Sequence, residues 1–329
     1  MPLALPSLSV LNNPQTKKWL YPTLWFMLVI WFLKSTVNKT GHYHGAHSRL
    51  LANSSLSNLV HDLTHTDSSS SALLNGGNQP GVTANASTSL KSAVIIETRR
   101  SAAIIPLVLH FSAVLGPDWP VIIYTSAENF GSFTTSQALL RHQKSGRVVI
   151  RSLPEGLFFP NWDSVSDFLT TPWLWNDLAP ADHVLIFQSD SVLCANSVRS
   201  VEDFFEYDYV GAPIAPELGV GYNGGLSLRK RSTMLRVLEE FQWGGGPEDQ
   251  WYFARMAELR EADEENGIEN GIRLPSMETA RTFAVETIDY PTPLGLHQPT
   301  RFIAAHDHMI PLDDWCPEYK LARTDRINE

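Results

Sequence analysis

Ala93-Val-Ile-Ile-Glu-Thr98 and Val121-Ile-Ile-Tyr-Thr125 are short runs rich in β-branched residues, and each predicts a buried strand. Between them, residues 102–115 are apolar at helical spacing. The alternation continues with a predicted helix over Ser136–Lys144 and a predicted strand over Arg147–Leu153. Strands that alternate with helices predict an α/β fold: a mainly parallel sheet flanked by helices, with a ligand crevice at the carboxyl ends of the strands.

The composition fits one large α/β domain. Of the 329 residues, 43% are hydrophobic and 18% are charged, which excludes a wholly disordered chain and a collagen-like repeat. The presence of only 2 Cys excludes a small disulfide-rich scaffold. The net charge of -10 argues against binding to nucleic acid, because that binding needs Lys and Arg to neutralise phosphates. We expect residues 93–329 to form the globular domain.

The N-terminal part contains one candidate membrane segment. The uncharged residues Trp19–Leu33 lie between Lys18 and Lys34 and carry aromatic side chains at both margins. A helix of this length spans ~22 Å, less than the ~30 Å hydrocarbon core, but flanking Lys side chains can snorkel. We expect a signal-anchor that follows a cytoplasmic tail of residues 1–18. The alternatives are a cleaved signal peptide, for which no clear cleavage site follows Leu33, and a buried or interfacial helix.

Residues 34–92 form a Ser/Asn-rich segment without a sustained apolar period, and we expect a disordered stem there. The segment contains three N-x-[ST] acceptors, at Asn38, Asn53 and Asn85. Their clustering predicts a glycoprotein stem in the secretory lumen, although this composition also produces such matches by chance. The sequence therefore predicts a single-pass type II protein of the Golgi or endoplasmic reticulum membrane, with the globular domain in the lumen.

A fourth predicted strand, His183–Phe187, is followed at once by Gln188-Ser-Asp-Ser191. A carboxylate just beyond a buried strand lies where a hard cation and its phosphate ligands are commonly held, so Asp190 is a candidate metal ligand. The alternative is a turn or a helix N-cap, which Asp and Ser often form after a strand.

A glycine-rich segment, Gly219–Leu228, is predicted to be a loop that enters a strand. Gly224 and Gly225 would let the backbone approach a ligand closely and would tolerate positive φ. The spacing matches neither a Walker A loop nor G-x-G-x-x-G, and a plain β-turn is the alternative.

Glu248 and Asp249 follow the run Gly244–Gly246 and are predicted to occupy the first turn of a helix. The helix dipole favours acidic residues there, which is the structural explanation. A carboxylate at this position could instead face a cleft and abstract a proton from a hydroxyl nucleophile. His297, in Leu294-Gly-Leu-His297, is either a structural histidine or a metal ligand.

Taken in chain order, these motifs resemble the four landmarks of GT-A-type glycosyltransferases: a metal-binding D-x-D, a glycine loop, an acidic pair and a C-terminal histidine. The fuller pattern resembles the largely fungal, glycosyltransferase-like family called domain of unknown function 5672; it comprises Leu185–Ser191, Asp208–Pro213, Gly224–Arg229 and Pro247–Asp249. The resemblance covers roughly residues 93 to 300 and implies a GT-A-like, Rossmann-like fold.

The resemblance also implies a metal site. By position, Asp190 would bind a divalent cation, Mn²⁺ or Mg²⁺, that bridges the diphosphate of a nucleotide-sugar, and His297 would be a second ligand. The first acidic position of D-x-D is Gln188 in this chain, and a neutral amide is a weaker ligand for such a cation. His306 and His308, which have metal-like spacing, compete with His297 for the ligand role.

For the remaining site residues, the resemblance implies that Gly224 and Gly225 line the donor or acceptor sugar. Asp249, or in second place Glu248, would deprotonate the acceptor hydroxyl. The basic pair Arg99–Arg100, just beyond the first strand, could contact phosphate or could simply be solvated. Of these two residues, Arg99 is the candidate for binding the donor.

Two further groups of residues have open roles. Trp162, Trp173 and Trp175 could pack against sugar rings, but core packing is the preferred interpretation. Cys194 and Cys316 could pair in an oxidising lumen and close a long loop.

The sequence therefore predicts an enzyme that moves a sugar from a nucleotide-sugar donor to a hydroxyl acceptor, such as a glycan, with the help of a metal. One alternative is a non-catalytic module that binds carbohydrate or nucleotide. The presence of Gln188 in place of the first acidic residue of D-x-D favours this alternative. Another is a metal-dependent phosphohydrolase that uses Asp190, His306 and His308.

Overall fold

The computed structural model describes residues 86, 88–101, 103–303 and 310–322, which belong to one compact unit. The predicted signal-anchor, nearly all of the predicted stem, the three glycosylation acceptors and the pair His306 and His308 lie outside these residues. Among the helices that the structure describes, none has the length and apolar character needed to cross a membrane.

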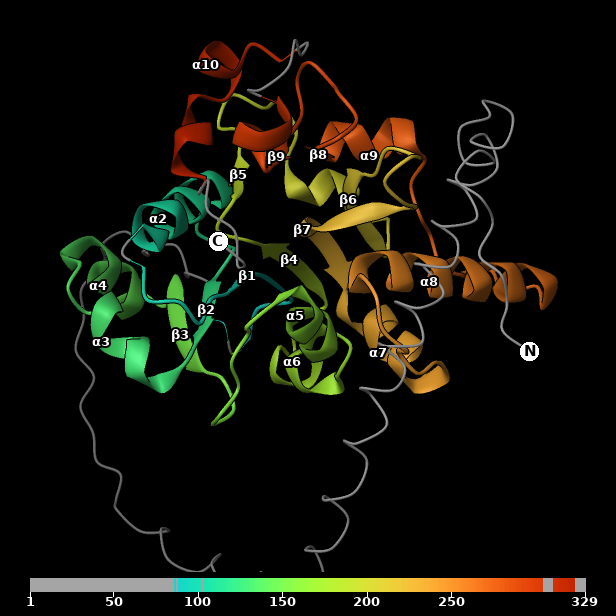
Figure 1. Cartoon of the computed structure of the whole chain (residues 1–329), viewed down its shortest axis with the longest axis horizontal. Coiled ribbons are helices and arrows are strands. Elements are labelled where there is room, and N and C mark those ends of the chain that lie inside the picture. The colour runs from blue at the N-terminus through green and yellow to red at the C-terminus, as the bar shows by residue number, and fades with distance from the viewer. Residues whose placement is uncertain (1–85, 87, 102, 304–309, 323–329) are drawn as a thin grey trace, which may run out of the picture. The chain divides into compact units, whose positions relative to one another are not determined.

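A six-stranded sheet forms the centre of the fold, in the order β3-β2-β1-β4-β7-β6 (Figure 1). Its strands are β1 (Lys91–Ile96), β2 (Val121–Thr125), β3 (Val148–Ser152), β4 (His183–Phe187), β6 (Tyr209–Pro213) and β7 (Tyr222–Lys230). The four strands β3, β2, β1 and β4 are parallel neighbours, whereas β7 runs antiparallel to both β4 and β6. The predicted mainly parallel sheet is therefore confirmed, with one reversed strand inside it.

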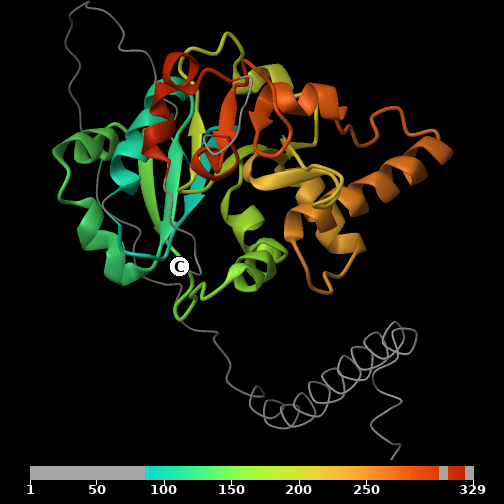
Figure 2. The ribbon, with the colours of Figure 1, turned by 45° about the horizontal axis from the view of Figure 1, so that its top comes forward.

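Helices lie on both sides of this sheet. The helices of the described chain are α2 (Ile104–Leu115), α3 (Phe130–Phe133), α4 (Gln137–Lys144), α5 (Trp162–Leu169), α6 (Pro172–Asp177), α7 (Arg231–Glu240), α8 (Glu248–Glu265), α9 (Met277–Phe283) and α10 (Leu312–Trp315), of which α10 packs on the small second sheet described below. Shorter helical turns are η2 (Ala127–Asn129), η3 (Val201–Phe204), η4 (Pro299–Ile303) and η5 (Pro317–Leu321). Helices α2 and α4 lie on one side of the parallel strands, and α5, α6, α7 and α8 lie on the other (Figures 1 and 2). Parallel strands joined by helical crossovers require this two-sided cover.

The parallel strands agree closely with the sequence. Strands β2 and β4 have the predicted bounds, and the helices predicted at residues 102–115 and 136–144 correspond to α2 and α4. Strand β1 begins earlier than expected, so Lys91 and Ser92 belong to the sheet and not to the predicted stem. Both residues pair with the start of β4, which explains why the strand extends to them.

The predicted glycine loop is corrected by the structure. Strand β7 begins at Tyr222, so Gly224 and Gly225 are strand residues, and neither has positive φ. The physical reason is the partner strand β6, which pairs Ala212 with Asn223 and so extends β7 past the end of β4. Gly219 and Gly221, which precede the strand, are the residues of this segment with positive φ.

The main core lies between the sheet and its helices. Phe111 of α2 stacks on Phe187 of β4 with ring centroids 3.7 Å apart, and both rings are fully buried. Among the helices of the other side, Trp175 of α6 packs edge-on against Tyr252 of α8 at 6.3 Å. This packing fixes the end of β4 and therefore the position of the residues that follow it.

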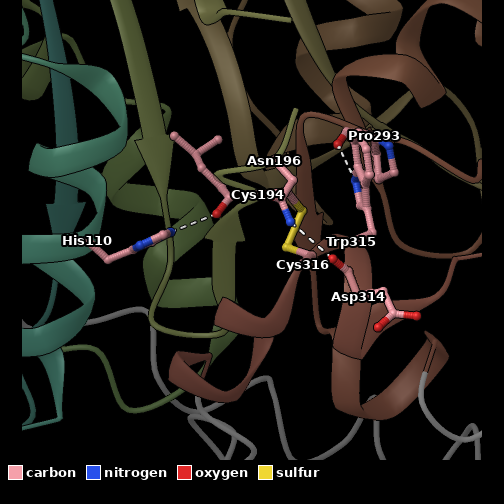
Figure 3. Close-up of a disulfide and its surroundings, with 8 residues drawn as sticks. His110, Cys194, Asn196, Pro293, Asp314, Trp315 and Cys316 are labelled. Atoms are coloured by element: carbon pink, nitrogen blue, oxygen red, sulfur yellow. Dashed lines mark hydrogen bonds between the residues drawn. A yellow bond between two sulfur atoms is a disulfide. The ribbon is translucent and has the colours of Figure 1, made fainter. Parts of the chain in front are cut away.

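A small second sheet, in the order β5-β9-β8, stands beside the main one; its strands are β5 (Ser191–Leu193), β9 (Gly295–His297) and β8 (Ala284–Val285). It has its own apolar cluster, made of Val192, Cys194, Val285, Leu296, Ile310 and Cys316. Within this cluster Cys194 and Cys316 form a disulfide, with Cα atoms 4.8 Å apart (Figure 3). The pairing that the sequence left open is therefore present.

Hydrogen bonds on either side of the disulfide attach the C-terminal segment to the small sheet. Asn196 donates its side-chain amide to the carbonyl of Asp314 at 3.0 Å, and Trp315 donates its indole N–H to the carbonyl of Pro293 at 3.1 Å (Figure 3). Because β9 begins shortly after Pro293, these contacts support the strand that ends in His297.

Removing the disulfide should lower the stability of the protein. Its two cysteines are 122 residues apart, so the cross-link restricts a long loop of the unfolded chain. We expect the double variant Cys194→Ala/Cys316→Ala to lose about 2 to 4 kcal/mol of the free energy of unfolding. Urea denaturation of the full chain measures this loss. If the disulfide stabilises by cross-linking, reduction of the wild-type protein gives a similar loss and does not affect the variant.

Candidate active site

A cavity of about 360 Å³ lies at the carboxyl ends of β1 and β4, where parallel strands are expected to form a ligand crevice. Each of the eight site residues chosen from the sequence lines it: Arg99, Gln188, Asp190, Gly224, Gly225, Glu248, Asp249 and His297. They come from the segments after β1 and β4, from β7, from the first turn of α8 and from the end of β9. The fold thus brings together five separate parts of the chain.

Asp190 and His297 meet because β5 pairs with β9. The antiparallel register sets Ser191 opposite His297, and the Nε2 atom of His297 lies 3.5 Å from Oδ1 of Asp190. On the other side of the ring, Nδ1 lies 3.2 Å from Oε1 of Glu286. His297 is 1% exposed, and neither of its ring nitrogens has a hydrogen-bond partner with suitable geometry in the described part of the chain.

The two carboxylates determine the charge of this histidine. Burial alone would lower the pKa of His297, but the negative charges of Glu286 and Asp190 outweigh burial and raise the pKa to about 10. In the same way, burial would raise the pKa of Asp190, but His297, with a smaller contribution from Arg99, lowers it. A positive charge between Asp190 and Glu286 is therefore stabilised by the structure.

Gly225 connects the end of β4 with β7. Its carbonyl oxygen accepts hydrogen bonds from the backbone N–H of Gln188 and from the hydroxyl of Ser191, both at 2.8 Å. Its Cα faces the imidazole of His297, so closely that a Cβ at this position would overlap the ring. The missing side chain of Gly225 therefore makes room for the histidine, and the close approach that the glycine was expected to allow is to a protein side chain.

Asp249 points into the cavity from the first turn of α8. Its Oδ2 accepts the backbone N–H of Gly224 at 2.9 Å, and its Oδ1 accepts the N–H of Gln250 at 2.8 Å. Burial, together with the negative charge of Glu248, raises the pKa of Asp249 to about 6. The group is therefore ionised at neutral pH and is a stronger base than an ordinary aspartate.

Glu248, next to Asp249, is held in a buried ion pair. Both of its carboxylate oxygens accept hydrogen bonds from Arg229, at 2.9 and 3.0 Å, and the Arg229 side chain has no exposed surface. Burial alone would lower the pKa of Arg229, but Glu248 outweighs burial and raises it. A Cβ at Gly224 would overlap this guanidinium group, so Gly224 is also required for protein packing.

Arg99 reaches the cavity from the segment after β1. Its guanidinium makes two hydrogen bonds to the buried Glu97, at 2.9 and 2.7 Å, and a third to the hydroxyl of Ser189 at 3.2 Å. The side chain thus bridges the ends of β1 and β4. Arg100 is exposed and does not line the cavity, whereas the half-buried Gln188 does.

The three tryptophans have different environments. Trp175 is fully buried and Trp173 packs against the core beside Phe168 at 5.7 Å, which agrees with the preferred expectation. Trp162 is 48% exposed and lines the cavity.

Three buried charged residues in or beside the site, Glu97, Glu286 and Arg229, were not among the candidates from the sequence. Glu286 comes directly after the short strand Ala284–Val285, so a carboxylate after an apolar pair was the only local signal for it. Arg229 lies in the basic run Arg229–Arg231, which is typical of an exposed segment, but β7 is paired on both sides at this residue and Glu248 balances its charge.

Of the residues that line the cavity, Asp190 and His297 are the best arranged to act as protein ligands of a cation. Two ligands of one divalent cation lie about 3 Å apart when each is ~2.1 Å from it, and the 3.5 Å separation of these two atoms is close to that value. Glu286 stands behind the imidazole in the manner of a carboxylate that orients a metal-binding histidine. No cluster of three or more His, Cys, Asp or Glu side chains suited to a metal occurs among the described residues.

Residues 147–297 match the family described as protein of unknown function DUF5672. The match agrees with the resemblance drawn from the motifs and includes, of the eight candidate residues that line the cavity, all except Arg99. None of the curated proteins matches the chain.

The solved structures that are similar to this chain include the following three. A mannosyltransferase from Pyrobaculum calidifontis, in complex with GDP-Man and Mn²⁺, has a TM-score of 0.38 and 11% identity over 60% of this chain and 58% of its own. The apo form of the glycosyltransferase GlyE from Streptococcus pneumoniae has a TM-score of 0.36 and 12% identity, over 63% and 54%. TarS 1-349 from S. aureus has a TM-score of 0.32 and 10% identity, over 50% and 54%. The aligned part of the chain spans between half and two thirds of each of these structures.

An alanine at position 225 should disturb the site. Its Cβ would lie 2.7 Å or less from the ring carbons of His297, which is too close for any relaxed contact. We expect Gly225→Ala to lower the free energy of unfolding by about 1 to 3 kcal/mol. Gly244→Ala is the matched control, because no atom lies within 4 Å of its Cβ, and its effect should stay within about 0.5 kcal/mol. Urea denaturation compares the two, and equal effects would contradict the described packing.

Proposed function

We propose that this protein is a glycosyltransferase that moves a sugar from a nucleotide-sugar donor to a hydroxyl acceptor. The main observation behind this proposal is that one cavity contains both the Asp190–His297 pair and a separate basic carboxylate, Asp249. The family motifs point to the same chemistry, and the central sheet and its helices fit a GT-A-like fold.

In the donor half of the cavity, Asp190 and His297 would hold a divalent cation. The ring atom Nε2 of the buried His297 faces Asp190 without a well-aligned hydrogen bond, and a cation bound there would replace the proton that the two carboxylates hold on the imidazole. Glu286 would keep the imidazole oriented, and oxygens of the donor diphosphate would complete the ligand set, as is usual for Mg²⁺. When bound, the cation neutralises charge on the leaving diphosphate. Arg99, fixed by Glu97 and Ser189, adds positive charge at the same end of the cavity.

In the acceptor half, Asp249 would act as the general base. Two backbone N–H groups fix its carboxylate, and its raised pKa suits proton abstraction near neutral pH. A base that activates the acceptor directly implies a single displacement with inversion of the anomeric configuration. A product that retains this configuration would contradict the assignment.

Glu248 would serve as a positioning residue and not as the base. Both of its oxygens are bound by the positively charged guanidinium of Arg229, whereas each oxygen of Asp249 accepts one neutral backbone N–H and keeps a lone pair that a hydroxyl can approach. The ion pair also fixes the first turn of α8 against β7, on which Gly224 donates its N–H to Asp249.

We further propose that the chain is a single-pass type II membrane protein with its catalytic domain in the lumen of the secretory pathway. The apolar run Trp19–Leu33 and the three acceptors for N-glycosylation support this topology. The disulfide between Cys194 and Cys316 supports it as well, because such bonds persist mainly in oxidising compartments.

Nucleotide binding tests the donor half. We expect the full chain, titrated calorimetrically with nucleoside diphosphates and nucleotide-sugars, to bind one nucleotide selectively and only in the presence of Mn²⁺. Asp190→Ala should weaken binding of Mn²⁺ and of the diphosphate by about 10- to 100-fold or more, because a ligand is lost. Asp118→Ala is the control, since Asp118 is exposed and remote from the cavity lining. Absence of nucleotide binding with and without Mn²⁺ would refute the proposed function.

Substitution of the base tests the acceptor half. Asp249→Asn should lower kcat for transfer by about 10²- to 10⁴-fold and leave the Kd of the donor nearly unchanged. Because the base must be ionised, transfer by the wild-type protein should fall as the pH drops through about 6, the pKa of Asp249. Transfer assays across this pH range measure both effects. A non-catalytic binding module would show no transfer in the wild type and no effect of the substitution on ligand binding.

A further inference from the structure

The proposed displacement divides the cavity into two halves. The leaving diphosphate would lie at Asp190 and His297, and the attacking hydroxyl must approach the sugar from the opposite face, next to Asp249. The acceptor therefore occupies the half bounded by the first turn of α8. The side chains that line this half define the class of acceptor it can bind.

One wall of this half is aromatic. Phe159 and Trp162 both line the cavity, and Trp162 keeps 48% of its surface exposed. Trp162 is the first residue of α5, which packs against α8, and Val165 and Ser166 of the same helix also line the cavity. An exposed indole at the mouth of a cavity is a surface on which a flat apolar face can lie.

The aromatic wall is preformed by the protein. Asn161 caps α5 by accepting the N–H of Ser164 at 3.0 Å, and the hydroxyl of Ser164 faces the N–H of Asn161 at 3.4 Å. This capping box fixes the backbone at Trp162. Phe159 packs on Phe168 at 5.5 Å, so its ring is fixed as well.

A second apolar group of the same half is Leu218, in the segment between β6 and β7, with 57% of its surface exposed. This segment is attached to α8, because Gln250 accepts the N–H of Val220 at 3.1 Å. Gly219 lies so close to Gln250 that a side chain there would overlap it. The segment is therefore held at the mouth of the cavity beside Asp249.

Polar groups stand between these apolar ones. Asp163 is exposed and lines the cavity next to Trp162, and Gln250 lines it beside Asp249. A hexopyranose ring presents both kinds of surface to the protein that binds it: an apolar face of C–H groups and a rim of hydroxyls that hydrogen-bond to carboxylates and amides. A lipid acceptor would match the apolar groups but not the acidic ones.

We propose that Phe159, Trp162, Asp163 and Leu218 form an acceptor subsite for a hexopyranose ring of a saccharide. The ring stacks on Trp162, its hydroxyls bond to Asp163, and the reacting hydroxyl reaches Asp249. This inference rests on the proposed function for the position of the acceptor, but saccharide binding at Trp162 can be measured without nucleotide or turnover.

The test is binding of saccharides to the full chain, measured by saturation-transfer NMR and calorimetry. The probes are methyl hexopyranosides and hexose disaccharides, each added alone. We expect at least one of them to bind the wild-type protein, and Trp162→Ala to raise its Kd about tenfold. Trp162→Phe, which keeps an aromatic face, should recover most of the affinity. The Kd for nucleoside diphosphate with Mn²⁺ should stay unchanged in both variants.

Phe158→Ala is the matched control, because Phe158 is 64% exposed, adjoins Phe159 and does not line the cavity. It should leave saccharide binding unchanged. The inference is overturned if no probe binds the wild type, if Trp162→Ala binds the probe as tightly as the wild type, or if Phe158→Ala weakens binding equally. Failure of the proposed function would appear separately, as loss of nucleotide binding and transfer while saccharide binding at Trp162 persists.

Discussion

Strand β7 continues past the end of β4, and this extension fixes the geometry of the cavity. The last paired residues of the two strands are Phe187 and Leu226, so Gly224 and Gly225 lie in β7 beyond the end of β4, next to the turn that follows β4. There the carbonyl of Gly225 binds both ends of that turn, through Gln188 and the Ser191 hydroxyl. The same short stretch of backbone donates to Asp249 and makes room for a histidine. Strand β7 therefore contacts residues of both halves of the proposed site and fixes their relative position.

The site buries more charge than stability alone would favour. Arg229 and Glu248 form a pair with almost no exposed surface, and His297 lies between Asp190 and Glu286. Removing such groups from water costs free energy that the pairing repays only in part, and apolar residues of similar size would often stabilise a core as well. Buried, mutually oriented charges are instead what preorganised catalysis uses, since their dipoles are already aligned when charge develops in a substrate.

The sequence predicts the parallel half of the sheet well because its strands are continuous apolar runs, which have one plausible burial pattern. It also predicts which residues line the cavity, because most of them lie at element ends where the backbone turns; Gly224 and Gly225, which lie inside β7, are the exception. It fails for β5, β8 and β9, which are two or three residues long and too short to show a period. The position of Glu286 depends on β8, so its place in the site could not be predicted from the sequence. Arg229 remained hidden for a different reason: its burial depends on Glu248, a partner from another element, which no local pattern encodes.

The position of β9 near the C-terminal end has a consequence for biosynthesis. Asp190 comes next to His297 only when β9 pairs with β5. The disulfide that supports the small sheet needs Cys316, which is synthesised after β9. A chain that grows from its N-terminus can form the parallel strands early, while these non-local contacts must wait. An incompletely synthesised domain would therefore contain the parallel core without the Asp190–His297 pair. The site could therefore form only after synthesis of the domain is nearly complete.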